Sequence, residues 1–259
     1  MSEPIAVPQP DQSRFDFALR LADNCLVLGQ RLAEWCGRGP ELEEDMALTN
    51  IALDLIGQAQ LWFEYASELD AQQRSADALA FFRDQSEFRN VLLVEQPNHD
   101  FGYTITRQFY FDSFHYLLLN ELVASTDQRV RGISEMAFKE VAYHLRHSTA
   151  WVCRLGDGTA ESHRRIQQAI SDLWCYTGEL FAPDTVDAEM FRDRVAPDLS
   201  RLQTTWLHQV NSIFKQATLQ LPESIWMQTG GKQGAHGESM GYLVGEMQFL
   251  RRIYPDAQW

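Results

Sequence analysis

Residues 48–69 read LTNIALDLIGQAQLWFEYASEL, and this stretch decides the fold. Its apolar side chains recur at alternating steps of four and three residues, which is the spacing of one face of an α-helix in a bundle. The recurring positions are Leu48, Ala52, Leu55, Ala59, Trp62, Ala66 and Leu69. We therefore predict a long helix over residues 41–69 that carries a continuous apolar seam.

Three further stretches show the helical pattern over comparable lengths, namely residues 13–35, 100–124 and 127–155. Asp100 is placed to cap the start of the second of these helices, because a short carboxylate can accept from the first free backbone N–H groups. Shorter helical stripes follow within residues 166–180, 199–217 and 243–253. The sequence predicts an all-α fold with four long core helices and additional C-terminal helices. We expect a flexible N-terminal tail over residues 1–12 and a single helical domain over residues 13–259.

Composition and charge exclude several classes of function. The 259 residues include 22 Lys and Arg against 36 Asp and Glu, which gives a formal net charge of −14. Because nucleic acids and anionic membrane surfaces bind clustered cations, we expect neither as a partner. The sequence contains no apolar run long enough to span a membrane, and it begins with no signal-peptide pattern. Its four cysteines form no C-x-x-C pair. These features predict a cytoplasmic protein with reduced thiols.

Several carboxylates and histidines interrupt the apolar stripes and raise the question of a metal site. A di-iron centre in a four-helix bundle takes one Glu from each of two helices and a Glu-x-x-His motif from each of the other two. The sequence contains no Glu-x-x-His and offers three near misses, Asp112-Ser-Phe-His115, Glu140-Val-Ala-Tyr-His144 and Asp54-Leu-Ile-Gly-Gln58. A buried carboxylate must be hydrogen-bonded or paired. We therefore favour a metal-free polar network of Asp54, Asp112, Glu140 and His144 over a working metal centre.

The glycine-rich segment 229–241 carries two further signals. Gly237-Glu-Ser-Met-Gly241 matches the nucleophile-elbow pattern, but no strand precedes Ser239 and no histidine follows it, so we set a hydrolase aside. Exposed glycine backbone can approach another chain closely, which makes Gly230, Gly231 and Lys232 candidates for a partner contact. The alternative, a simple connector between helices, is about as good an interpretation of such a loop.

Five segments of the chain, taken in order, are similar to a known family, the PaaC-type subunits of the bacterial phenylacetyl-CoA epoxidase. They are residues 28–37 (LGQRLAEWCG), 50–59 (NIALDLIGQA), 92–98 (LLVEQPN), 229–232 (TGGK) and 246–251 (EMQFLR). The resemblance implies a ferritin-like bundle that pairs with a homologous catalytic subunit, which itself holds the di-iron centre. Where that catalytic subunit has its two Glu-x-x-His motifs, this sequence has Leu55-Ile-Gly-Gln58 and Val141-Ala-Tyr-His144. Three of the four motif ligands are thus replaced, by Leu55, Gln58 and Val141.

The resemblance implies a non-catalytic structural subunit of a multicomponent epoxidase of phenylacetate catabolism, which stabilises and positions the catalytic oxygenase subunit among the other components of the complex. No cofactor is then expected in this chain. One alternative is a self-sufficient metal-dependent oxygenase that uses the degenerate set Asp112, His115, Glu140 and His144. Another is a helical protein without an enzyme partner, whose apolar seam closes on a second copy in a homodimer.

Overall fold

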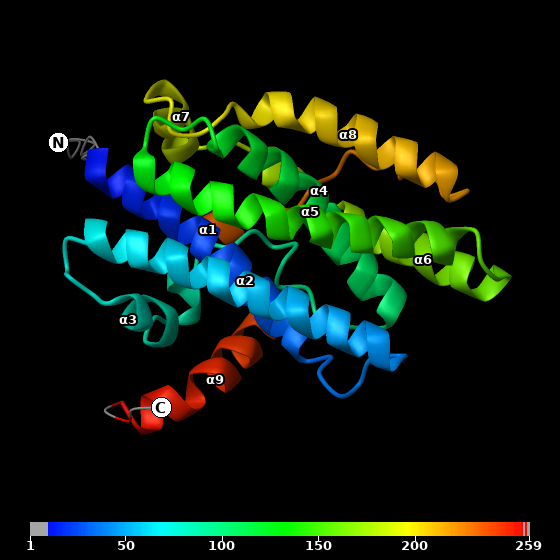
Figure 1. Cartoon of the computed structure of the whole chain (residues 1–259), viewed down its shortest axis with the longest axis horizontal. Helices are drawn as coiled ribbons and strands as arrows, with labels where there is room; N and C mark the ends of the chain where they lie inside the picture. The colour runs from blue at the N-terminus through cyan, green and yellow to red at the C-terminus, as the bar shows by residue number, and fades with distance from the viewer. Residues whose placement is uncertain (1–9, 256, 258–259) are drawn as a thin grey trace.

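The computed structural model describes residues 10–255 and 257, and within them it contains helices and no strand (Figure 1). Four long helices form the core: α1 (Pro10–Ala33), α2 (Leu42–Leu69), α4 (Phe101–Leu122) and α5 (Gln128–Gly156). The prediction of an all-α, ferritin-like bundle is confirmed. The first helix begins three residues earlier than predicted, and the rest of the predicted N-terminal tail, residues 1–9, lies outside the described part of the chain.

The core helices pack as two hairpins. α1 lies along α2, α4 lies along α5, and α2 and α5 join the two pairs (Figure 1). Asp100 and Asp127 cap α4 and α5, because their carboxylates accept from the backbone N–H groups of Tyr103 at 2.8 Å and Arg129 at 2.9 Å. The predicted cap at Asp100 is therefore confirmed.

Helix α4 is the most deeply buried element. Every residue from Gly102 to His115 is buried, on all sides of the helix. α5, α6 (Ala160–Trp174) and α8 (Leu199–Gln216) surround α4, and Trp206 of α8 donates from its indole N–H to the carbonyl of Tyr110 at 3.2 Å. A helix buried all round must satisfy each polar side chain internally. This requirement explains why the polar groups of α4 dominate the interior of the bundle.

The remaining elements are short or peripheral. They are α3 (Ala76–Phe81), α7 (Thr185–Arg192), α9 (Glu238–Ile253) and three single 3₁₀ turns, η1 (Gln85–Glu87), η2 (Gly178–Phe181) and η3 (Gly231–Gln233). The sequence pattern did not predict α7. Helix α9 contacts α1 and α3 and extends from the body of the bundle (Figure 1). Within the described ranges, no helix combines the length and the apolar character that crossing a membrane requires.

Candidate functional site

The four core helices each direct one polar side chain at the same level of the bundle. α1 supplies Cys25, α2 supplies Gln58, α4 supplies Asp112 and α5 supplies His144, and all four are buried. This is the arrangement by which bundles of this type build metal sites from facing helices. The sequence pattern predicted Asp112 and His144 as network members and gave no signal for Cys25.

Two separate sets of contacts occupy this level. In the first set, Gln58 donates from Nε2 to Glu140 Oε2 at 2.8 Å, while Cys25 Sγ lies 3.8 Å from Gln58 Oε1. In the second set, His144 Nε2 lies 3.0 Å from Asp54 Oδ2, and Asp54 keeps about a third of its side chain exposed. The first set links three core helices and the second joins α2 to α5.

Asp112 bonds a serine and a glutamine rather than the second set directly. The Ser148 hydroxyl lies 2.7 Å from Asp112 Oδ2 and 3.0 Å from the carbonyl oxygen of His144, and Gln108 donates from Nε2 to Asp112 Oδ1 at 2.6 Å. The structure therefore brings Asp54 and His144 together directly, whereas Asp112 bonds Ser148 and Gln108, and Ser148 reaches only the backbone of His144. Glu140 instead accepts a hydrogen bond from Gln58. The resemblance identifies Gln58 only as a position at which a metal ligand has been replaced.

Burial controls the protonation of these groups. It raises the pKa of Asp112 to about 6, although the charge of His144 and the hydrogen bonds from Ser148 and Gln108 oppose the rise. Burial also lowers the pKa of His115 to about 3, and the neighbouring His144 lowers it further, so His115 is neutral at physiological pH. Burial and the nearby charge of Glu140 raise the pKa of Cys25, which keeps its sulfur a thiol.

The raised pKa of Asp112 predicts a specific pH dependence of stability. The folded protein binds this proton more tightly than the unfolded chain does, since the ordinary pKa is 3.8 and the folded pKa is about 6. The resulting stability is present below pH 3.8 and is lost as the pH rises through 6. Relative to Asp112→Asn, the wild type should lose up to about 3 kcal/mol between pH 4 and 7. Urea unfolding of both proteins across this range measures the difference, and parallel curves would contradict the prediction.

The residues at the centre do not fit a di-iron centre. Leu55 and Val141, at two positions where the resemblance expects Glu ligands, are fully buried hydrocarbon, and Gln58 is bonded to Glu140. Across residues 10–255 and 257, no group of three or more His, Cys, Asp or Glu side chains is placed to hold a metal ion. His115 and His144 each have a buried Nδ1 without a hydrogen-bond partner in the described part of the chain. The donors that remain, Asp112, His115, Glu140 and His144, are not gathered within the described residues into a group that could hold a metal ion, whereas a di-iron centre needs such a group.

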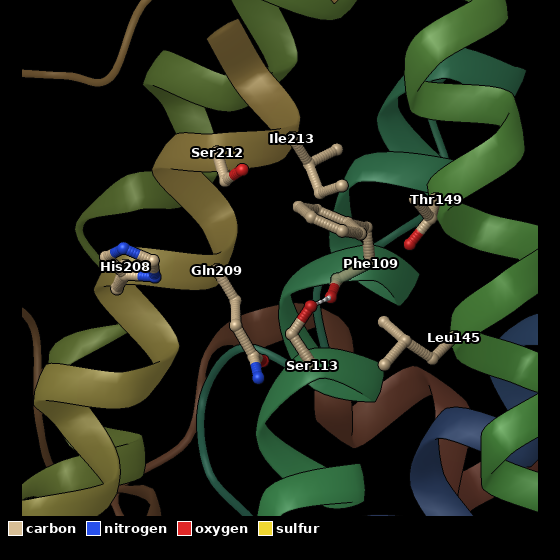
Figure 2. Close-up of a pocket in the computed structure, with 8 residues that line it drawn as sticks. All are labelled: Phe109, Ser113, Leu145, Thr149, His208, Gln209, Ser212 and Ile213. Atoms are coloured by element: carbon tan, nitrogen blue, oxygen red, sulfur yellow. Dashed lines mark hydrogen bonds between the residues drawn. The ribbon is translucent and has the colours of Figure 1, made fainter. Parts of the chain in front are cut away.

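A cleft of about 340 Å³ lies outside this level, between α4, α5 and α8 (Figure 2). Phe109, Leu145 and Ile213 form its apolar wall, and the polar lining residues are Ser113, Thr149, His208, Gln209 and Ser212. Figure 2 shows the Ser113 hydroxyl turned back to the carbonyl of Phe109, to which it donates at 2.7 Å. None of the central residues lines the cleft, and His208 is its one ionisable group. Ser113, Thr149 and Ser212 offer hydroxyl groups and His208 offers a base, but none of these hydroxyls is hydrogen-bonded to His208 among the described residues, so the cleft holds no assembled nucleophile and base.

The glycine-rich segment is only partly exposed, and the expectation that its candidate contact residues are exposed is wrong for Gly231 and Lys232. Gly231 and Lys232 are buried, and the Lys232 ammonium donates to the carbonyl of Ala182 at 2.9 Å and to Asp187 at 3.1 Å. A Cβ atom on Gly231 would lie 2.2 Å from the carbonyl oxygen of Asn90, so only glycine fits there. Gly230, which is half-buried, has a φ of +136°. These residues contact their own chain, and close backbone approach is the reason for the glycines.

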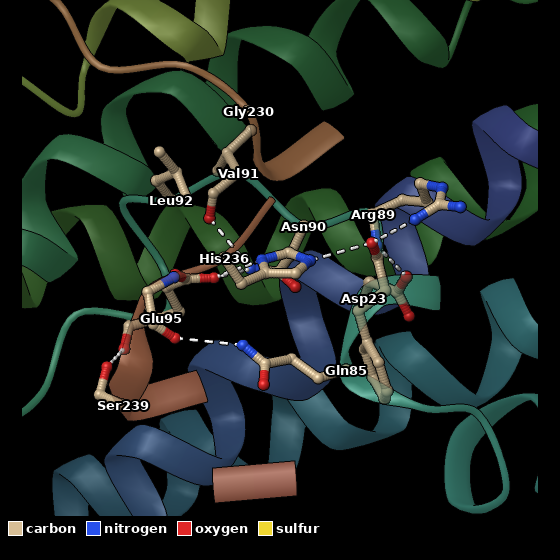
Figure 3. A network of polar contacts seen from close by, with 12 residues as sticks. Asp23, Gln85, Arg89, Asn90, Val91, Leu92, Glu95, Gly230, His236 and Ser239 are labelled. Carbon is tan, nitrogen blue, oxygen red and sulfur yellow. Dashed lines mark hydrogen bonds and ion pairs between the residues drawn. The ribbon is translucent and has the colours of Figure 1, made fainter. Parts of the chain in front are cut away.

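We call residues 228–237 the strap, because buried carboxylates fix them across the 88–95 segment (Figure 3). Glu179 accepts from the backbone N–H groups of Leu92 at 2.7 Å, Gly230 at 2.9 Å and Lys232 at 3.3 Å. Glu95 accepts from His236 Nδ1 at 2.7 Å and from the Gly237 N–H at 2.7 Å. Sequence reasoning missed both glutamates, since Glu95 lies in a short apolar segment with no helical stripe and Glu179 lies off the stripe at the end of residues 166–180.

His236 sits between two acceptors in this strap. Its Nδ1 faces Glu95, its Nε2 lies 3.0 Å from the carbonyl oxygen of Phe88, and its side chain is fully buried (Figure 3). Burial alone lowers the pKa of His236, but the hydrogen bond and charge of Glu95 and the Phe88 carbonyl outweigh it and raise the pKa above 6.5. Only the doubly protonated ring can donate to both acceptors.

Comparison with known proteins gives two findings. Residues 5–259 match the model of the family described as phenylacetic acid catabolic protein. This chain belongs to that family. It is also 48% identical over 243 residues to a protein of Escherichia coli (strain K12) that is named as a subunit of 1,2-phenylacetyl-CoA epoxidase, and the match covers 94% of this chain and 98% of that protein. The resemblance drawn from the sequence is confirmed.

In this phenylacetic acid catabolic protein, two of the segments that carry the resemblance, residues 92–98 and 229–232, meet in space. Glu179 joins them through the N–H groups of Leu92, Gly230 and Lys232. Asn98, in the first of these segments, also bonds the carbonyl of Arg31 and the side chain of Arg107. Two of the segments that carry the resemblance thus hold this chain's own fold together.

Proposed function

We propose that this chain is a non-catalytic structural subunit of a phenylacetyl-CoA epoxidase that acts in phenylacetate catabolism. It stabilises and positions a homologous catalytic subunit, and the catalytic subunit carries the di-iron centre that epoxidises the substrate. One observation carries the proposal: at the level where the bundle would hold metal, Leu55 and Val141 supply hydrocarbon and Gln58 is bonded to Glu140. The Escherichia coli relative, which is named as an epoxidase subunit and shares 48% identity with the chain, supports membership of a multi-subunit enzyme.

A face of α2 and α5 supports docking of the catalytic subunit. Helices α2 and α5 pack against each other, and both expose large apolar side chains at a spacing of seven residues. These residues are Met46 and Leu53 on α2 and Met136 and Tyr143 on α5. Large apolar side chains that are exposed on packed helices are candidates for contact with another protein. Residues 10–255 contain four free cysteines, which supports a cytoplasmic location for the complex.

Iron content tests the proposal. The chain, purified alone from cells grown in iron-rich medium, should contain less than ~0.1 iron per chain, because its donors cannot complete a di-iron site. It should also co-purify with the catalytic subunit, which serves as the iron-binding control when it is purified in parallel. About two irons per chain would support the alternative of a self-sufficient oxygenase. A homodimer that ignores the catalytic subunit would support the other alternative, a helical protein without an enzyme partner.

A further inference from the structure

Helix α9 is apolar on both of its faces. Met240, Leu243, Val244 and Gln248 form the inner face, which packs against α1 and α3. On the outer side, large apolar residues are more than half exposed, namely Tyr242, Phe249, Leu250 and Ile253. Large apolar side chains that are exposed together on one side of a helix are typical of a contact surface. The outer face of α9 is therefore an apolar surface against which no other described segment of the chain packs.

Two exposed carboxylates lie on the outer side of α9, Glu238 at its start and Glu246 in its middle, and Glu246 is the one that the apolar residues surround. Glu246 is one helical turn from Tyr242, Phe249 and Leu250, and it forms no hydrogen bond or ion pair with any described residue. The two arginines of α9 are engaged on the other side of the helix, where Arg251 pairs with Asp77 at 3.5 Å and Arg252 with Asp84 at 3.1 Å. The outer face therefore presents apolar side chains around an uncompensated negative charge.

A groove of about 270 Å³ runs beside Glu246, between α9 and the end of α1. Leu243, Met247 and Ala33 form its apolar lining, and Gln30, Glu34 and Glu246 form its polar lining. Glu34 already pairs with Arg31 at 2.8 Å, so Glu246 is the open acceptor. The groove fits a long side chain with an apolar stem and a cationic end, which describes lysine or arginine.

Charge decides between a second copy of this chain and a different partner. If two α9 helices packed antiparallel about a two-fold axis, each Glu246 would face the apolar residues or the Glu246 of the other copy. Either contact would bury a carboxylate without a cation. The net charge of −14 adds general repulsion between two copies. Complementarity therefore favours a different protein that carries both apolar and basic side chains.

We propose that the outer face of α9 docks an amphipathic helix of another epoxidase subunit, with a lysine or arginine of that helix in the groove against Glu246. This inference rests on the proposed function, because it takes its partner from the same complex. Tyr242, Phe249 and Ile253 supply the apolar contact, as helix-in-groove recognition requires. Glu246 selects the partner, since an apolar helix without a cation would leave the carboxylate buried and unpaired.

Charge reversal tests the inference. The tagged chain is mixed with the purified remaining subunits of the phenylacetyl-CoA epoxidase, and binding of each is measured at two salt concentrations. Glu246→Arg should weaken the binding of one subunit by about tenfold or more, and Phe249→Ala should weaken the same subunit. Glu121→Arg is the matched control, because Glu121 is an exposed carboxylate on α4, away from this face, and its reversal should leave binding unchanged. Both α9 positions are exposed, so circular dichroism should report unchanged folding.

The outcomes separate this inference from the proposed function. If the wild-type chain binds no epoxidase subunit, the proposed function fails and this inference fails with it. If the wild type binds while Glu246→Arg and Phe249→Ala bind equally well, only the α9 inference fails. If the wild type is a dimer that Glu246→Arg alters, a second copy covers α9 and the inference is overturned. A photo-crosslinking amino acid at Tyr242 should label a helix that contains lysine or arginine, and labelling of an acidic segment would contradict the assignment.

Discussion

Asp23→Ala is expected to lower the free energy of unfolding by about 3–5 kcal/mol, because it leaves a buried guanidinium without its counter-ion. Asp23 is fully buried, and Arg83 donates to it from Nη1 at 3.0 Å and from Nη2. The backbone N–H of Arg89 donates to the same carboxylate at 2.8 Å. The carboxylate of Asp23 thus links α1 to Arg83, which follows α3, and to Arg89 in the 88–95 segment.

An exposed ion pair supplies the matched control. Arg129 and Glu68 also join two elements, but about half of each side chain is exposed. Solvent screens such a pair, so Glu68→Ala should change stability by about 0–1 kcal/mol. Urea unfolding of both variants and the wild type, fitted with a common slope, gives the comparison. If Asp23→Ala costs no more than Glu68→Ala, then burial does not strengthen the Asp23–Arg83 pair as we argue.

Most of the helices could be predicted because their signals are local. The seam from Leu48 to Leu69 and the cap at Asp100 depend on residues within a few turns of one another. Helix α7 was missed because it has only eight residues, and it buries only Val186 and Met190. So short a helix offers no repeat for a pattern to detect.

The interior contacts were harder to predict because their partners lie far apart in the chain. An inward-pointing Asp112 follows from its place in an apolar stripe, but its link to Ser148 spans 36 residues. Gln58 reaches Glu140 across 82 residues, and neither residue type marks the other as its partner. The burial of Gly231 and Lys232 was predicted wrongly for the same reason: a glycine-rich segment has the same composition whether it is exposed or pressed against Asn90.

Glu179→Ala should be the most damaging single change in the strap. The buried backbone N–H groups of Leu92 and Lys232 and that of half-buried Gly230 lose their shared acceptor. An unsatisfied buried donor costs about 1–3 kcal/mol, and with partial recovery by water the total should be about 3–5 kcal/mol. Glu179→Gln should cost less, because the amide keeps one acceptor oxygen, although its NH₂ group then faces a backbone donor.

Amide hydrogen exchange distinguishes local release of the strap from general destabilisation. In Glu179→Ala, the N–H groups of Leu92, Gly230 and Lys232 should lose protection before the core of α4 does, because Glu179 holds the strap rather than the bundle. The buried N–H groups around Tyr110, which lie under Trp206, serve as the internal reference. Equal loss of protection at both places would mean that the strap is part of one cooperative unit with the bundle. Preferential loss of protection in the strap would instead explain why glycines and a buried glutamate are needed in that segment. They attach the segment that leads into α9. They thereby fix the orientation of the α9 face that we propose as a docking surface.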